Sequence, residues 1–174
     1  NSCHGNDRYW TGAYISRTAI NAAAEHARTH AKDMLHVAVW HHGLSGTPGR
    51  PDRLTMLDIG ALHNAGFRIG FHGHTHRAET ETLDRFFGDR FTVISTGSIG
   101  AGAAERPDAV GNQFSLVRLH LGQVTVTVYE RDGEHGVFAP REPRFHLLPL
   151  EPLRPARLRH VRRHQLSWTV HENG

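Results

Sequence analysis

The sequence has very little cysteine and no long run of apolar residues. Cys3 is the only cysteine, which excludes a disulfide framework and a zinc site built from cysteines. The sequence contains no signal peptide and no apolar stretch of membrane-spanning length, so we expect a cytoplasmic protein that makes no contact with a membrane. The chain begins with Asn1 rather than methionine. We therefore expect a fragment of a longer protein.

Lysine is almost missing as well, because Lys32 is the only one among 20 basic residues. Arginine supplies the rest, and seven arginines gather near the end of the chain: Arg141, Arg144, Arg154, Arg157, Arg159, Arg162 and Arg163. This composition predicts a folded domain over residues 1–149 and an Arg- and Pro-rich tail or linker over residues 150–174. A basic tail suits contact with the phosphates of a nucleic acid, but a solvated linker is the favoured interpretation.

Two apolar segments each end in histidines. The segment 67–72 alternates apolar with polar or small residues, as a strand does, and leads into Gly73-His74-Thr75-His76. The segment 35–40 is almost continuously apolar and leads into His41-His42-Gly43. Because loops at the carboxyl ends of parallel strands converge on one crevice, at least three imidazoles should meet there. Neutral imidazole is the commonest protein ligand of transition metals, so the pattern predicts a metal site.

The remaining segments indicate the fold class. Alanines at every fourth residue from Ala19 to Ala31 predict an amphipathic helix. A second helix is predicted over residues 54–65, with Asp52 as its cap and Gly66 as its stop. A strand over 91–96 and two runs over 114–121 and 124–129 predict further strands, the last two as an antiparallel hairpin. We expect an α/β fold of mixed β-sheets flanked by helices.

The order of these motifs resembles the C-terminal half of the calcineurin-like metallophosphoesterases. The strand ending in His41-His42, the strand ending in Gly73-His74-Thr75-His76, the Thr96-Gly97-Ser98 loop and the hairpin follow one another as in that family, over roughly residues 1–148. The resemblance implies a four-layer sandwich of two mixed sheets flanked by helices, with residues 1–149 as the C-terminal portion of the domain.

The resemblance also implies a site with two divalent transition metal ions, for which Mn, Fe, Zn and Ni are all suitable. By this resemblance His41 and His74 would bind one ion and His76 the other. His42 would contact the substrate phosphate or support a ligand, and packing behind the metal loop is an equal alternative. Gly43 stands where the family usually has proline.

The family's N-terminal motifs, Asp-x-His, Gly-Asp and Gly-Asn-His-Asp/Glu, are not found in the sequence. Gly5-Asn6-Asp7 is at most a degenerate form of the last one, which would make Asn6 a ligand. The resemblance therefore implies that the upstream half of the same domain is needed to complete the metal site.

Two hypotheses on function follow. The first is hydrolysis of a phosphomonoester or phosphodiester, with a nucleotide or nucleic acid among the substrates or partners to consider. The alternative is a non-catalytic metal-binding module, or a module that binds a partner or nucleic acid, derived from the same fold. Ser98 is not expected to act as a nucleophile, because no strand-turn-helix elbow surrounds it.

Overall fold

A computed structural model describes residues 2–3, 12–32, 34–46, 52–86, 89–120, 122–133, 135–141 and 143–147. Asn6 and the tail predicted for residues 150–174 lie outside the described residues. The described helices and strands are α1 (Arg17–His30), β1 (Val37–Val39), α2 (Met56–Asn64), β2 (Ile69–His72), β3 (Ala78–Phe86), β4 (Asp89–Thr96), η1 (Ala103–Glu105), β5 (Asn112–His120), β6 (Gln123–Arg131), β7 (Phe138–Pro140) and β8 (Arg144–Leu147). None of the described helices is long and apolar enough to cross a membrane.

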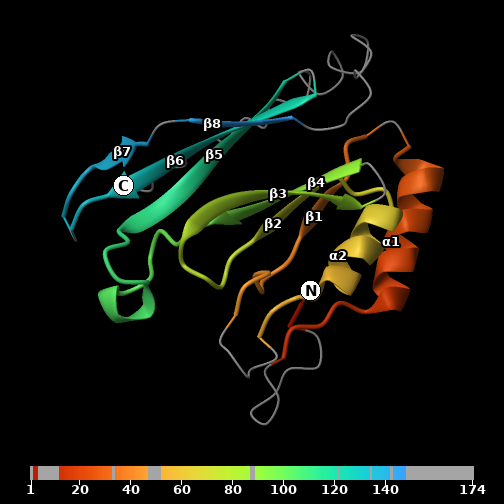
Figure 1. The fold of residues 1–174 in the computed structure, drawn as a ribbon, viewed down its shortest axis with the longest axis horizontal. Helices are drawn as coiled ribbons and strands as arrows, with labels where there is room; N and C mark the ends of the chain where they lie inside the picture. The colour runs from red at the N-terminus through yellow and green to blue at the C-terminus, as the bar shows by residue number, and fades with distance from the viewer. Residues whose placement is uncertain are drawn as a thin grey trace, which may run out of the picture.

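The strands form two sheets, so the predicted mixed α/β fold class is confirmed. The first sheet has the order β1-β2-β4-β3, in which β1, β2 and β4 run parallel and β3 runs antiparallel to β4. The second sheet is antiparallel, with β5 and β7 beside β6 and with β8 also paired to β6. The predicted hairpin is the pair β5–β6. In Figure 1, α1 and α2 lie on one face of the first sheet and the second sheet lies over its other face.

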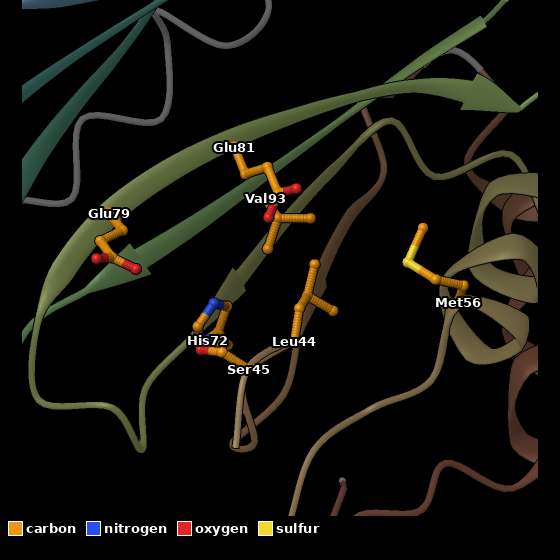
Figure 2. A pocket seen from close by; sticks show the side chains of 7 residues that line it. All are labelled: Leu44, Ser45, Met56, His72, Glu79, Glu81 and Val93. Atoms are coloured by element: carbon orange, nitrogen blue, oxygen red, sulfur yellow. The ribbon is translucent and has the colours of Figure 1, made fainter. Parts of the chain in front are cut away.

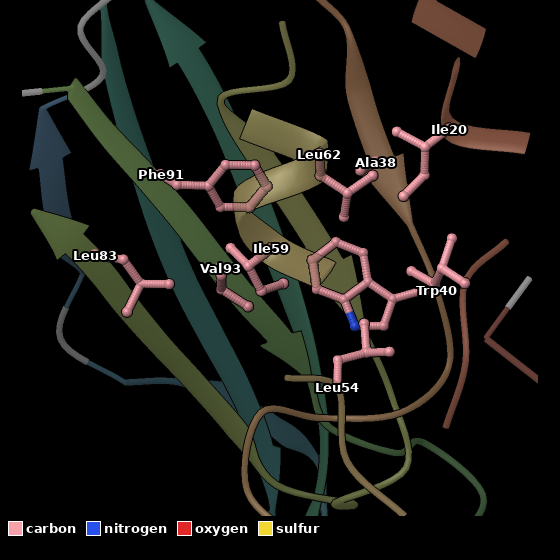
Figure 3. Packing of buried hydrophobic residues seen from close by; sticks show 10 residues of the cluster. Ile20, Ala38, Trp40, Leu54, Ile59, Leu62, Leu83, Phe91 and Val93 are labelled. Carbon is pink, nitrogen blue, oxygen red and sulfur yellow. The ribbon is translucent and has the colours of Figure 1, made fainter. Parts of the chain in front are cut away.

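Each face of the first sheet has its own core. Strand alternation and register place Ala38, Gly70 and Val93 side by side on the face toward the helices. Trp40, Ile59, Leu62 and Phe91 pack with Ala38 and Val93 between sheet and helices, as Figure 3 shows. On the opposite face, Ile69 and Ile94 pack against Val124 and Val126 of the second sheet. The described residues thus build three layers: helices, first sheet and second sheet.

The ends of the helices follow from local chemistry, with one correction. Helix α2 is capped by Thr55 and not by Asp52, because Thr55 and Asp58 form a reciprocal capping box at the helix start. Gly66 follows the helix with φ of +93°, a conformation that favours glycine, so its predicted role as a stop is confirmed. Helix α1 is capped by Ser16, whose hydroxyl accepts a hydrogen bond from the Ala19 N–H.

Strand β3 was not predicted. Its residues include Glu79, Thr80, Glu81 and Thr82, which lack the apolar alternation that signals a half-buried strand. It lies at the edge of the first sheet, where charged side chains are tolerated and protect against pairing with other chains.

Candidate functional site

The parallel pairing of β1 and β2 brings the two histidine loops together, as predicted. The backbone pairing continues beyond the strands, because Gly73 N–H donates to the carbonyl of His41 at 3.1 Å. Trp40 N–H likewise donates to the carbonyl of Phe71 at 3.0 Å. The loop after β1 and the loop after β2 are therefore fixed side by side at the carboxyl edge of the sheet.

The loop after β2 has an unusual backbone. His74 and His76 have φ values of +68° and +52°, which are uncommon for residues other than glycine. Such conformations cost of the order of 1–3 kcal/mol and gather at functional sites, where the surrounding structure imposes them. Here the two positive φ values turn the backbone sharply after β2, so that His74 and His76 both lie in the loop directly after the strand.

Three imidazoles, His41, His42 and His74, form what we call the histidine cluster. Their ring centroids lie 5.0–5.1 Å apart in each pairing. The closest approach joins His41 Nε2 and His74 Nδ1 at 3.2 Å. Two nitrogens bound to one tetrahedral zinc ion at about 2.0–2.1 Å would lie about 3.3 Å apart. The pair therefore fits a shared metal ion with little rearrangement, and without one the two nitrogens can share a proton.

His42 is positioned by Ser2, which is fully buried. The Ser2 hydroxyl oxygen accepts from the backbone N–H groups of His41 and His42 at 2.9 and 3.0 Å, and it lies 2.9 Å from His42 Nδ1. With both lone pairs used, the hydroxyl proton is donated to Nδ1. The neutral ring of His42 then carries its own proton on Nε2 and acts there as a donor.

His76 lies beside the cluster and is held by η1. Its Nδ1 donates to the carbonyl of Glu105 at 2.6 Å, which leaves Nε2 with a free lone pair. A ring N–H bonded to a carbonyl is the usual support for a metal-ligating histidine. His76 makes no ring contact with the histidine cluster among the contacts of the described residues, and its ligand role stays a prediction.

No group of three or more His, Cys, Asp or Glu side chains converges well enough to hold a metal ion among the described residues. The arrangement therefore offers a pair of nitrogens on His41 and His74, with His76 close by. Carboxylate ligands of the kind that the family resemblance requires are not part of this group.

Burial and neighbouring charge lower the pKa of His41 and His42. Burial lowers the pKa of His41, and the neighbouring charge of His74 lowers it further. The pKa of His42 is lowered by burial first and then by His74. Neutral imidazole is the form that binds a metal ion, so the lowered pKa of His41 favours its role as a ligand at neutral pH.

Two residues near the site were not predicted to belong to it. Ser2 lies 40 residues from the histidine that it positions, and serine at such a separation has no recognisable pattern. His72 was expected in the core or on the sheet surface, and it is buried, with its ring stacked on Trp40 at a centroid distance of 6.1 Å. Strand alternation could have placed His72 on the helix-facing side, beside Trp40.

Comparison with known proteins gives only solved structures, because no family model and no curated protein matches this sequence. Vps29 from Chaetomium thermophilum is 22% identical, with a TM-score of 0.40 over 66% of this chain and 55% of that one. Wild type Vps29 complexed with Zn²⁺ from Entamoeba histolytica is 21% identical, with a TM-score of 0.42 over 63% of this chain and 54% of that one. Vacuolar protein sorting 29 from Cryptosporidium parvum is 24% identical, with a TM-score of 0.37 over 51% of this chain and 44% of that one. The chain spans about half the length of these structures.

Proposed function

We propose that this chain is a metal-binding module of the metallophosphoesterase type, in which His41 and His74 hold one divalent transition metal ion. The observation that carries this proposal is the 3.2 Å separation of His41 Nε2 and His74 Nδ1. The two rings come from separate strand ends, and backbone hydrogen bonds fix those ends together. A bound ion would supply Lewis acidity and lower the pKa of a coordinated water.

The chain's own residues would have separate roles in binding that ion and in positioning its ligands. His41 and His74 bind it, and Ser2 fixes the loop that presents His41 by accepting its backbone N–H. His76 offers Nε2 as a ligand for a second divalent ion, Mn, Fe, Zn or Ni, as the family resemblance implies. Upstream residues of the same domain would have to complete both coordination shells.

A second candidate function is hydrolysis of a phosphomonoester or phosphodiester, and the orientation of His42 favours it. Its Nε2–H is a donor beside His41 and His74, where a phosphoryl oxygen bound to the metal would need one. His42 would then bind substrate. Because the described histidine site lacks carboxylates, this activity belongs to the chain joined to its upstream half. Contact of the arginine-rich tail with a nucleic acid or nucleotide stays a prediction.

Zinc binding to the full chain tests the proposal by isothermal titration calorimetry. His26 and His30 stack one helical turn apart, with centroids 4.8 Å apart, and an exposed pair of imidazoles at this spacing is a competing zinc ligand set. The test therefore uses a His26→Ala/His30→Ala background. In that background one zinc ion should bind, and His41→Ala or His74→Ala should each weaken it by more than the ~10–100-fold typical of losing a supporting hydrogen bond.

The matched control is His120→Ala, an exposed histidine at the end of β5, which should leave zinc affinity unchanged. Unchanged affinity in both His41→Ala and His74→Ala would rule out the proposed site. Hydrolysis of bis(4-nitrophenyl) phosphate, measured in parallel on this chain and on one extended upstream, tests the second candidate. Activity that appears only in the extended chain and disappears with His42→Ala would support it, and no activity in either chain would contradict it.

A further inference from the structure

A cavity of about 300 Å³ lies on the helix-facing side of the first sheet, with His72 among the residues that line it. Figure 2 shows Glu79 and Glu81 of β3 on one side and His72 of β2 on another, with Met56 at the start of α2 across the opening. We call it the His72 cavity. Its volume is in the range of pockets that bind small molecules.

The strand register explains why the cavity lies there. Glu79, Glu81 and Leu83 point to one face of β3, opposite Ser95, Val93 and Phe91 of β4. Leu83 packs in the core under the helices, whereas Glu79 and Glu81 are exposed. The sheet face is thus covered at one end of β3 and open at the other, with carboxylates over the open part.

His72 is the buried polar group of this cavity. Its side chain is nine-tenths buried, with 8% relative exposure, and its Nδ1 donates to the carbonyl of Gly73 at 2.9 Å. Because a carbonyl only accepts, the proton of the neutral ring is on Nδ1 and the lone pair is on Nε2. Nε2 has no hydrogen-bond partner among the described residues. The ring is held by the Trp40 stack and by Gly43, where an added Cβ would come within 3.2 Å of His72 Cε1.

The polar groups around the cavity are almost all hydrogen-bond acceptors. Glu81 forms no ion pair within the described part of the chain. Glu79 pairs with Arg77 at 3.0 Å, but both side chains are more than half exposed, and such surface pairs contribute about 0–1 kcal/mol. Ser45 adds one hydroxyl. A ligand that satisfies these groups must therefore be rich in donors and positively charged.

The geometry also selects the size of the cation. Glu79, Glu81 and His72 do not converge as a metal site, since no such group of three exists among the described residues. A cation that spans several atoms suits separated acceptors better than a single ion. Leu44, Met56 and Val93 give the cavity an apolar wall along which methylene groups can pack.

We propose that the His72 cavity binds a small organic cation with an alkyl chain, of the alkylguanidinium or alkylammonium class. Its charged head lies between Glu81 and His72 Nε2, with Glu79 as a secondary contact, and its alkyl chain lies against Leu44, Met56 and Val93. This site does not depend on the metal proposal, because none of the groups that bind the head belongs to the histidine cluster.

The test is a titration of the full, metal-free chain with n-butylguanidinium, followed by NMR chemical shifts. Its neutral analogue n-butylurea has a similar shape and N–H donors but no charge. The guanidinium should bind with shifts centred on His72, Glu81 and Val93, and raised salt should weaken it. Glu81→Gln should weaken binding by up to about fivefold, because an ion pair with an exposed carboxylate is lost, and Glu79→Gln should have a smaller effect.

The control variant is Asp132→Asn, which removes the same charge from an exposed turn after β6 and should leave affinity unchanged. Glu81 is exposed on an edge strand, so its replacement by glutamine keeps the fold. Equal affinity for n-butylurea, or unchanged affinity in Glu81→Gln, would overturn the proposal. Shifts centred away from His72 would overturn it as well. Zinc binding is measured separately, so failure here leaves the metal proposal unaffected.

Discussion

At the scale of single residues, the Ser2 hydroxyl positions the loop that carries His41 and His42. Its oxygen accepts two backbone N–H groups and contacts the ring of His42. In Ser2→Ala the two N–H groups lose their acceptor in a largely buried place. We expect a loss of unfolding free energy of roughly 1–3 kcal/mol, measured by urea denaturation. The ring of His42 should also lose its single tautomer, which ¹⁵N chemical shifts report.

The matched control for Ser2→Ala is Ser115→Ala. The Ser115 hydroxyl is buried without a hydrogen-bond partner among the described residues, so its removal should be neutral or slightly stabilising. If both variants change stability equally, the Ser2 hydroxyl does not hold the loop as argued here.

Residue-scale prediction from sequence succeeded where the signal was local. The nearness of His41 and His74 followed from two strand ends that carry histidine, and the structure confirms it. Their ligand roles, and that of His76, stay predictions. Ser2 and the tautomer of His42 could not be predicted, because they depend on a contact across 40 residues that no spacing rule describes.

At the scale of secondary-structure elements, β2 and β1 are fitted to one another by a glycine. A Cβ at Gly70 would lie 2.2 Å from Cη2 of Trp40 and 3.2 Å from Cε1 of Phe91, and both rings are buried in the helix-side core. Gly70→Ala should therefore displace the tryptophan and cost about 1–3 kcal/mol of unfolding free energy in urea. The displaced ring should also disturb His72, which stacks on it.

Gly100→Ala provides the control for this substitution. No atom lies within 4 Å of a Cβ added at Gly100, and its φ is outside the left-handed region, so stability should change by less than about 0.5 kcal/mol. A Gly70→Ala protein as stable as the Gly100→Ala protein would contradict the tight packing of Trp40 on β2.

Element types were predictable where hydrophobic periodicity was strong. Helix α1, the strand β4 and the β5–β6 hairpin all fall where the pattern placed them. Strand β3 was missed because its carboxylates interrupt the pattern, and those carboxylates are the ones that line the His72 cavity. The cap of α2 was misplaced by three residues because Asp52 and Thr55 are both good capping types, and only the bond to Asp58 distinguishes them.

At the scale of the whole molecule, the sheets and helices are joined by two cores that share the first sheet. Ile69 and Ile94 on one face are fully buried against the second sheet, and Phe91 on the other is fully buried under the helices. Sequence alternation predicted helices over a mixed sheet, but not which sheet face each core would use. That choice depends on the register between strands, which a single sequence does not specify.

The stability of the whole molecule should depend on pH through three histidines near the site, of which His42 and His72 are buried. Burial is the largest cause that lowers the pKa of His41, His42 and His72 in the folded protein. The unfolded chain keeps the ordinary value of about 6.5, so below that pH it binds more protons than the folded chain does. Unfolding free energy should therefore be highest above about pH 6.5 and fall as the pH is lowered toward the folded-state values.

Urea denaturation between about pH 8 and pH 5.5, with EDTA to remove metal ions, measures this dependence below the unfolded histidine pKa but above that of most carboxylates. His42→Asn removes one of the three groups and should flatten the slope, whatever it does to stability at pH 8. His120→Asn, on the exposed end of β5, should leave the slope as it is. A free energy that stays constant or rises as the pH falls would mean that these imidazoles become protonated without cost in the folded protein. In that case the lowered pKa values argued for His41, His42 and His72 would be wrong.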